Sequence, residues 1–314
     1  MSHDVACVGL MILDILGRPV ERIPQGGDVA FIDEIRLTVA GTAGGTVIDC
    51  AKLGLSALAA GAVGNDEKGD FVLDTLLRHG VDIAAMRRTA EAPTSATILN
   101  VRPNGDRPAL HVRGASDHLW LDESDYDLVC DARFLHMGGT GLLSRMDGEP
   151  TAALLRAAKA RGCITTFDLI APTDDTMAIV GPCLPYIDYF MPSMEEAAAL
   201  SGRSTPEDIT RYFLDGGTKT CILKWGERGS FVANAEAAFR VPAFAVDVVD
   251  TTGCGDAYCA GFIAGLSRGW DLERSCRLAT AASGLVATGL GSDAGIVDFD
   301  KTAELAASGR IRDI

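Results

Sequence analysis

The feature that most constrains the fold is a regular alternation of short apolar segments with helix-forming segments after residue 130. Each apolar segment has the length of a buried strand, and the segments between them have helical spacing. This alternation is typical of strands that run parallel in one sheet, with helices covering both faces. We therefore predict an α/β fold with a mostly parallel central sheet. The segments that carry the pattern are 134–137, 151–161, 164–168, 186–191, 195–201 and 220–224.

Two stretches in the N-terminal third have a different pattern, that of β-hairpins. After a first apolar strand at 5–10, paired β-like segments occur at about 12–38 and again at 96–113, each interrupted by turn-forming residues. We expect these hairpins to form a small β lid next to the main sheet. Because no repeat, low-complexity tract or linker divides the sequence, we expect residues 1–314 to form a single domain.

Charge and cysteine content exclude several classes of protein. The chain has 28 lysines and arginines against 43 aspartates and glutamates, a formal charge of −15, whereas a nucleic-acid backbone is bound by clustered basic residues. Its nine cysteines form no C-x-x-C pair, so we expect neither a zinc site nor a disulfide framework. No apolar run reaches the roughly 18 residues of a membrane span. These observations predict a cytoplasmic protein without nucleic-acid or membrane partners.

One segment, Asp-Thr-Thr-Gly-Cys-Gly-Asp at 250–256, combines a phosphate cradle with a carboxylate. Gly253 and Gly255 allow successive backbone N–H groups to point at one position, and helical spacing begins directly after them. An anion there would lie at the N-terminus of a helix, which favours negative charge. Asp256 could accept the proton of a substrate hydroxyl. The segment therefore predicts phosphoryl transfer, although a tight turn followed by a capping aspartate would use the same residues.

This segment resembles the C-terminal signature of the ribokinase-like, or PfkB, family of carbohydrate and nucleoside kinases. The usual family form is D-T-T-G-A-G-D followed by a helix containing G-x-F, and this chain has Cys254 at the alanine position. The resemblance implies a ribokinase-like three-layer fold with a small β-sheet lid, and phosphorylation of a sugar hydroxyl with ATP and Mg²⁺. It makes Asp256 the general base and assigns the anion hole to its amide together with those of Gly253, Cys254 and Gly255.

Other segments resemble motifs of the same family, in the same order along the chain. Asp14, shortly after the first strand, matches an aspartate that binds substrate hydroxyls, and 52–54 matches the end of the N-terminal motif. Residues 61–70 are similar to the family stretch G-x-V-G-x-D-x-x-G. Residues 192–197 are similar to P-N-x-x-E-A, which gives Glu196 the role of organising magnesium and phosphate indirectly.

The resemblance also assigns residues to the nucleotide and to a monovalent cation. Residues 223–229 are similar to the T-x-G-x-x-G loop on the nucleotide side, and 289–292 resemble the adenine-side loop. Many family members hold a cation such as K⁺ with the first aspartate and second threonine of the signature, here Asp250 and Thr252. The residues assigned to the nucleotide are Lys224, Gly226, Gly229, Thr252 and Gly291.

The sequence departs from the family pattern where the substrate is expected. The family motif G-G-x-x-x-N ends in an asparagine that contacts substrate hydroxyls, and Gly45 has that position here. The loop keeps glycines at Gly41, Gly44 and Gly45, so its backbone could approach a substrate closely, or it could simply start a packed helix. Ser193 replaces the asparagine before the metal-organising glutamate. These departures leave the acceptor of the phosphoryl group open.

Three further residues have both a functional and a plain structural interpretation. Asp168 ends a predicted strand, where ligands gather in open α/β sheets, but the segment lacks the asparagine and arginine of the D-x-N-x-R found in some sugar kinases. It could bind substrate or simply cap a turn. Arg113 in the lid could pair with a phosphate or carboxylate of the substrate, or be solvated. We expect His136 to pack with its ring hydrogen-bonded to the sheet.

The main prediction is a sugar kinase, and the alternatives share parts of its evidence. A nucleoside kinase of the same family would have the same catalytic centre. A regulatory protein that binds nucleotide without turnover would be of a different class, and an intact Asp256 argues against it. A dinucleotide-dependent dehydrogenase is disfavoured because the first strand is not followed by G-x-G-x-x-G. Exposed lid strands offer a pairing edge, so we expect a homodimer formed through the lid.

Overall fold

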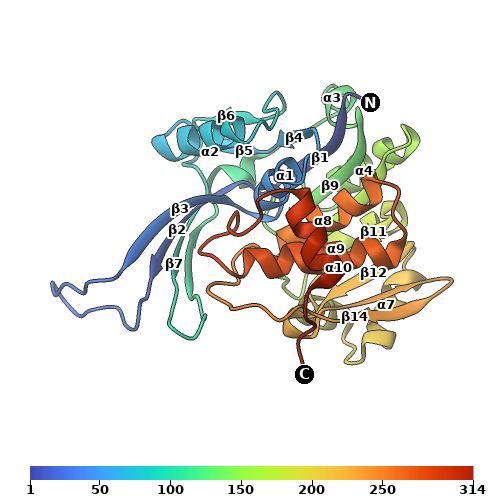
Figure 1. Cartoon of the computed structure of the whole chain (residues 1–314). Helices are drawn as coiled ribbons and strands as arrows, with labels where there is room; N and C mark the ends of the chain where they lie inside the picture. The colour runs from blue at the N-terminus through green and yellow to red at the C-terminus, as the bar shows by residue number, and fades with distance from the viewer. Residues whose placement is uncertain (314) are drawn as a thin grey trace.

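A central sheet of eight strands runs through the molecule (Figure 1). The computed structural model describes residues 1–313 and orders the strands β14-β13-β12-β11-β10-β9-β1-β4. All neighbours from β4 to β12 are parallel, and β13 and β14 are antiparallel at one edge. This confirms the predicted α/β fold. The strands are β1 (His3–Gly9), β4 (Ala57–Ala60), β9 (Ala132–Thr140), β10 (Ile164–Leu169), β11 (Tyr189–Phe190), β12 (Thr220–Lys224), β13 (Ser230–Asn234) and β14 (Ala238–Val241).

Helices cover the two faces of this sheet, so each face has its own apolar core. In β1, Val5 and Cys7 point to one core while Ala6 and Val8 point to the other, as the period of two in a strand requires. The first core is completed by α1 (Thr42–Lys52), α2 (Glu67–Arg78), α8 (Cys254–Ser267), α9 (Leu272–Val286) and α10 (Phe299–Ser308). The second is completed by α3 (Tyr126–Val129), α4 (Glu149–Ala160), α5 (Thr176–Val180), α6 (Met194–Ser201) and α7 (Pro206–Asp215).

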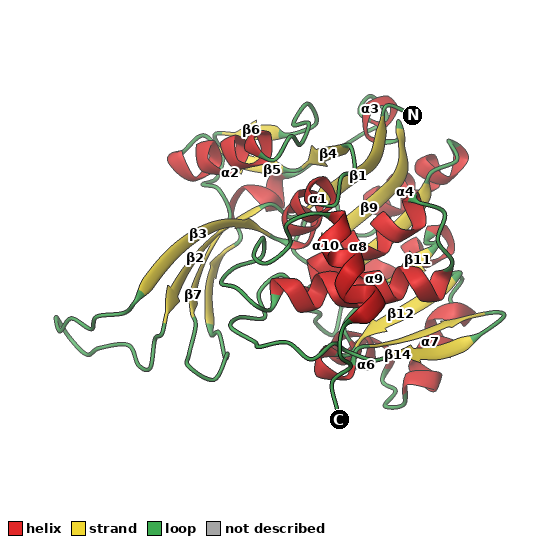
Figure 2. Cartoon of the chain, in the orientation of Figure 1, coloured by secondary structure: helices red, strands yellow, loops and turns green. Residues whose placement is uncertain are grey.

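A separate four-stranded sheet projects from this body with long loops at its tip (Figure 2). Its order is β3-β2-β7-β8, from strands β2 (Ile12–Arg18), β3 (Glu34–Ala40), β7 (Ala96–Asn100) and β8 (Ala109–Val112). Both predicted hairpins thus contribute to one lid sheet, with β2 and β7 parallel at its centre. The strands are shorter than the predicted segments, because residues 19–33 are loop. That stretch contains Pro19 and Pro24, which cannot donate to a strand ladder.

A third, two-stranded sheet pairs β5 (Ala62–Gly64) with β6 (Arg87–Thr89) in parallel. The sequence does not predict β6, because its Arg-Arg-Thr segment has no apolar alternation. Short 3₁₀ helices complete the fold at η1 (Gly114–His118), η2 (Gly181–Tyr186) and η3 (Gly226–Arg228). No helix within residues 1–313 is both long enough and apolar enough to span a bilayer.

Candidate active site

A cavity of ≈ 1120 Å³ lies between the lid, the carboxyl ends of the central strands and the first turn of α8. Open parallel sheets commonly bind ligands at this edge. The predicted site residues that line the cavity are Asp14, Gly41, Asp168, Glu196, Lys224, Gly226, Gly229, Thr252, Gly253, Cys254, Gly255 and Asp256. Five predicted residues are not part of the lining, namely Gly44, Gly45, Arg113, Asp250 and Gly291.

The 250–256 segment forms a turn that opens directly into α8. Gly253 is the N-cap and has a left-handed φ of 78°. A Cβ atom there would lie 2.4 Å from Cα of Ser292, so both the conformation and the close approach require glycine. The amides of Gly255 and Asp256 lie in the first helical turn, where N–H groups have no intrahelical acceptor. This geometry suits an anion.

Cys254 is the first residue of α8 and lines the same cavity. Its amide donates to the carbonyl of Thr251 (3.3 Å), which tightens the turn before the helix. Burial raises the pKa of its thiol to about 12, so the side chain is neutral at physiological pH. The cysteine that replaces the family alanine therefore adds no charge to the phosphate cradle.

Asp256 is buried at the third position of α8, against the first turn of α1. A Cβ atom on Gly45 would lie 2.6 Å from its Oδ2 atom, and Thr46 Oγ1 donates to its carbonyl (3.3 Å). Burial raises the pKa of Asp256 to about 8, with a further increase from the Asp168 carboxylate. A carboxylate with this pKa is a suitable proton acceptor near neutral pH.

An ion pair between Lys224 and Asp168 stands beside this carboxylate. Lys224 ends β12 and Asp168 is the penultimate residue of β10, and Lys224 Nζ donates to Asp168 Oδ2 at 2.5 Å. Burial alone would lower the pKa of Lys224, but the Asp168 carboxylate raises it above its usual value. The amine also lies 3.1 Å from the position of a Cβ atom on Gly255. The fold therefore places a fixed positive charge next to the anion-binding turn.

Glu196 is held in place by the start of α6. Ser193 Oγ accepts from the Glu196 amide (3.1 Å), and Glu196 Oε2 accepts from the Ser193 amide (2.9 Å), which is a capping box. The serine that replaces the family asparagine is thus the N-cap of the helix. Burial raises the pKa of Glu196, and its side chain lines the cavity together with Lys224.

The inner face of the lid contributes polar side chains to the opposite wall. Asp14 and Thr97 are in register on β2 and β7, and Thr97 Oγ1 is hydrogen-bonded to His111 Nδ1 on β8 (3.1 Å). Burial raises the pKa of Asp14 to about 6. Thr97, His111 and Arg107 also line the cavity, and the sequence interpretation did not include them. For Thr97 the alternation within β7 was an available signal, because Thr97 and Leu99 are buried while Ile98 between them is exposed.

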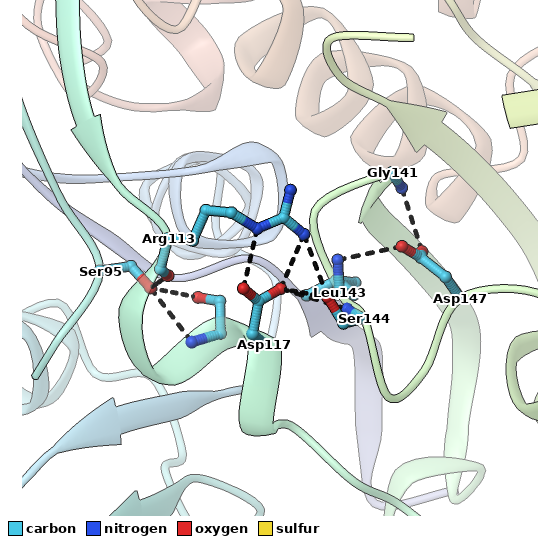
Figure 3. Close-up of polar contacts among 8 residues, drawn as sticks. Ser95, Arg113, Asp117, Gly141, Leu143, Ser144 and Asp147 are labelled. Atoms are coloured by element: carbon cyan, nitrogen blue, oxygen red, sulfur yellow. Dashed lines mark hydrogen bonds and ion pairs between the residues drawn. The ribbon is translucent and has the colours of Figure 1, made fainter. Parts of the chain in front are cut away.

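The predicted lid arginine, Arg113, is engaged elsewhere (Figure 3). Its Nε and Nη2 atoms donate to the two oxygens of Asp117, each at 2.8 Å, and Nη2 also donates to Ser144 Oγ (3.2 Å). Asp117 in turn accepts from Ser144, so the group forms a closed network. In this structure Arg113 does not line the cavity, and its Nε and Nη2 donors are taken by Asp117 and Ser144.

Asp250 is fully buried and ties two loops together. Its Oδ1 atom accepts from the amide and hydroxyl of Thr252 (3.0 and 2.8 Å), and its Oδ2 atom accepts from the amide of Gly291 (2.9 Å). Three of about four acceptor positions on the Asp250 carboxylate are therefore occupied by the protein itself.

His136 is buried in the central sheet, as expected. Its Nδ1 atom is hydrogen-bonded to the hydroxyl of Thr166 on the neighbouring strand (2.9 Å).

Curated relatives align with most of the chain. The ATP-dependent 6-phosphofructokinase of Thermoanaerobacterium thermosaccharolyticum is 27% identical over 306 residues, which are 95% of this chain and 92% of that protein. The aminoimidazole riboside kinase of Salmonella typhimurium is 28% identical over 253 residues, 77% of this chain and 79% of that protein.

The fold is shared with solved kinase structures. A provisionally named ribokinase II from E. coli, solved in complex with ATP and Mg²⁺, has a TM-score of 0.82 and 23% identity, covering 97% of this chain and 99% of that one. The family model for pfkB carbohydrate kinases matches residues 2–298. This protein therefore belongs to the pfkB family of carbohydrate kinases.

Proposed function

We propose that this chain transfers the γ-phosphoryl group of ATP to a hydroxyl of a small sugar or sugar-derived substrate. The observation that carries the proposal is the position of Asp256, a buried carboxylate at the N-terminus of α8 that faces a cavity also lined by Lys224. A proton acceptor, free helical amides and a fixed cation thus meet at one point. These are the groups that phosphoryl transfer to an alcohol requires.

The proposed reaction is a direct displacement at phosphorus. The substrate oxygen attacks the γ-phosphorus, the bond to the bridging β–γ oxygen breaks, ADP leaves, and the hydroxyl proton passes to the Asp256 carboxylate. The amides of Gly255 and Asp256, with the ammonium group of Lys224, stabilise charge on the phosphoryl oxygens. Asp14 and the lid hold the sugar hydroxyls against the catalytic carboxylate.

We assign the nucleotide to the side of the cavity formed by Gly226, Gly229 and Thr252, next to the Gly291 loop. Within residues 1–313, no three His, Cys, Asp or Glu side chains are grouped as ligands for a metal. Glu196, which lines the cavity, would help to orient a magnesium ion indirectly. Mg²⁺ would neutralise charge on the phosphates.

A K⁺ ion is a further proposal and is tested separately. Asp250 keeps about one free acceptor position, enough for one contact to a cation that backbone carbonyls would also have to hold. Replacing K⁺ with tetramethylammonium at constant ionic strength should then lower activity. Equal activity in the two salts would remove K⁺ from the proposal.

The outer face of the lid supports a homodimer. Leu37, Ile15, Ile98 and Leu110 form one row in register across all four lid strands. Leu37, Ile98 and Leu110 are 46%, 49% and 66% exposed, so they form an apolar surface that a second lid would cover. We propose that residues 1–314 act as one kinase domain that dimerises through this face.

All nine cysteines are free thiols, which suits a reducing compartment such as the cytoplasm. This supports the proposed cytoplasmic location.

Nucleoside phosphorylation is the second candidate function, favoured by the riboside kinase among the relatives. A nucleotide-binding regulator without turnover is the third, and the intact Asp256 argues against it.

Coupled measurement of ADP release separates these candidates. The panel would contain neutral sugars, keto-deoxy sugar acids, phosphosugars and nucleosides, with a no-acceptor blank for ATP hydrolysis. We expect release well above the blank with a sugar or sugar derivative. Release with nucleosides alone would support the second candidate, and nucleotide binding without release on any acceptor would support the regulator.

A further inference from the structure

The loop between β7 and β8 brings Arg107 onto the phosphate-binding turn. Its Nε atom donates to Thr251 Oγ1 (3.2 Å) and its Nη2 atom donates to the Thr251 carbonyl (3.5 Å). Its Nε atom is 4.0 Å from Oδ1 of Asp250. The side chain also lines the cavity that contains Asp14 and Asp256. A residue at the tip of the lid thus touches the loop that leads into α8.

The guanidinium group of Arg107 still has hydrogen-bond donors to offer. A guanidinium has five N–H groups, and within the described residues those of Arg107 contact only Thr251, with Asp250 as the nearest carboxylate. The side chain is 40% exposed. Arg113, in contrast, is held in a two-point pair with Asp117 (Figure 3). Of these two lid arginines, Arg107 is the one free to meet a ligand.

The charges around the cavity favour an anion near this group. Near the proton acceptor, the carboxylates of Asp14, Asp168 and Asp256 line the cavity together with the cations Lys224 and Arg107. The rest of the lining includes Glu195, Glu196, Glu227 and Arg312. The positive charge of Arg107 opposes the effect of burial on both Asp14 and Asp256, so its field reaches the wall where proton transfer would occur. A phosphoryl group placed on the amides of α8 would lie within the same field.

We propose that Arg107 is a catalytic residue whose guanidinium pairs with the phosphoryl group during transfer. The inference rests on the proposed function and adds a group that the lid itself supplies. Because Arg107 is fixed to Thr251 and not to the sugar-facing row of Asp14, Thr97 and His111, it belongs to the phosphate end of the cavity. Because Arg107 is carried by the lid and already contacts Thr251, the position of the lid over the sugar and the position of this cation are linked.

The direct test is binding of a mimic of the transferring phosphoryl group. Isothermal titration calorimetry would compare MgADP alone with MgADP plus fluoroaluminate for the native protein, Arg107→Ala and Arg107→Lys. Arg102→Ala is the matched control, an exposed arginine in the same hairpin loop that does not line the cavity. We expect Arg107→Ala to bind MgADP normally but to lose roughly 10- to 100-fold in affinity for the fluoroaluminate complex, with partial recovery in Arg107→Lys.

Equal fluoroaluminate affinity in Arg107→Ala and the native protein would overturn the inference and leave the proposed function standing. Failure of the native protein to bind MgADP would overturn the proposed function itself.

Steady-state kinetics with an acceptor found in the panel provide a second test of the role of Arg107. We expect kcat to fall with little change in KM for the sugar. A raised KM for acidic acceptors only, with kcat kept, would assign Arg107 to the substrate and contradict its role at the phosphoryl group.

Discussion

Gly45 on α1 and Asp256 on α8 approach so closely that a Cβ atom on Gly45 would lie 2.6 Å from Oδ2 of the aspartate. In the family motif that this segment resembles, an asparagine stands at the position of Gly45. In this chain the corresponding space is taken by the proposed catalytic base. Asp256 therefore lies directly against α1, where any side chain at position 45 would meet it.

Adding a side chain at position 45 should therefore displace the carboxylate. We expect Gly45→Ala and Gly45→Asn to lower kcat by about 10-fold or more, because small errors in the position of a catalytic group are costly. Gly181→Ala is the control, since a Cβ atom there meets nothing within 4 Å. Steady-state kinetics and near-UV circular dichroism would measure the effect, and an unchanged kcat in Gly45→Asn would contradict it.

Removing the charge of Asp256 should abolish turnover. Asp256→Asn keeps the size of the side chain but cannot accept the hydroxyl proton, so we expect kcat to fall by roughly 10²- to 10⁴-fold. MgADP affinity should change little, because the helical amides remain. Asp74→Asn, an exposed change on α2, is the control. Turnover within a few-fold of the native value would exclude Asp256 as the base.

The pKa of Asp256 also predicts how activity depends on pH. Only the ionised carboxylate accepts a proton, and its pKa of about 8 in the free protein means that the active fraction rises with pH up to that value. We expect log kcat/KM to increase with a slope near one and to level off above pH 8. A profile that is flat between pH 6 and pH 9 would show that another group controls proton transfer.

The free energy of unfolding should fall as pH rises, whereas activity should increase. The Asp256 carboxyl has a pKa of 3.8 when unperturbed and about 8 in the fold, so between these values the native state binds more protons than the unfolded state. The free energy of unfolding then falls as pH rises. Asp256→Asn should remove part of this loss and have a higher Tm than the native protein at pH 8. Thermal unfolding at pH 5 and pH 8 would measure it, and equal Tm shifts at both values would contradict it.

The Lys224 and Asp168 pair allows structural and catalytic effects to be separated. Lys224→Met leaves a buried carboxylate without its partner, which costs about 3–5 kcal/mol in comparable pairs. We expect the double variant Lys224→Met with Asp168→Asn to recover much of that stability but little kcat, because the cation beside the anion hole is still missing. Urea unfolding and kinetics on the same samples would test this. Recovery of kcat together with stability would make the pair purely structural.

Dimerisation can be tested on the outer face of the lid. Ile98→Asp puts a charge in the centre of the apolar row and should give monomers in sedimentation velocity runs. Leu128→Asp is the control, an exposed leucine on α3 outside the lid sheet. Finding only monomers for the native protein would refute the proposed dimer.

Local patterns in the sequence were sufficient to predict the central sheet and the phosphate-binding turn. The apolar strands carry their own periodicity, and Gly253 and Asp256 act within one short segment. The pairing of Lys224 with Asp168 joins residues from different strands, which no local pattern reports. Arg107 lies in the β7–β8 loop and Arg113 directly after β8, and no local pattern in the sequence reports which of the two reaches the cavity.

Cys254 has a consequence for how the protein survives oxidants. Oxidation and alkylation need the thiolate, and burial raises the pKa of the Cys254 thiol to about 12, so the neutral thiol predominates at pH 7. A cysteine in the middle of a phosphate-binding loop would ordinarily make a kinase sensitive to peroxide. Here the raised pKa keeps the sulfur of Cys254 in its unreactive thiol form, so peroxide at neutral pH should inactivate the protein slowly.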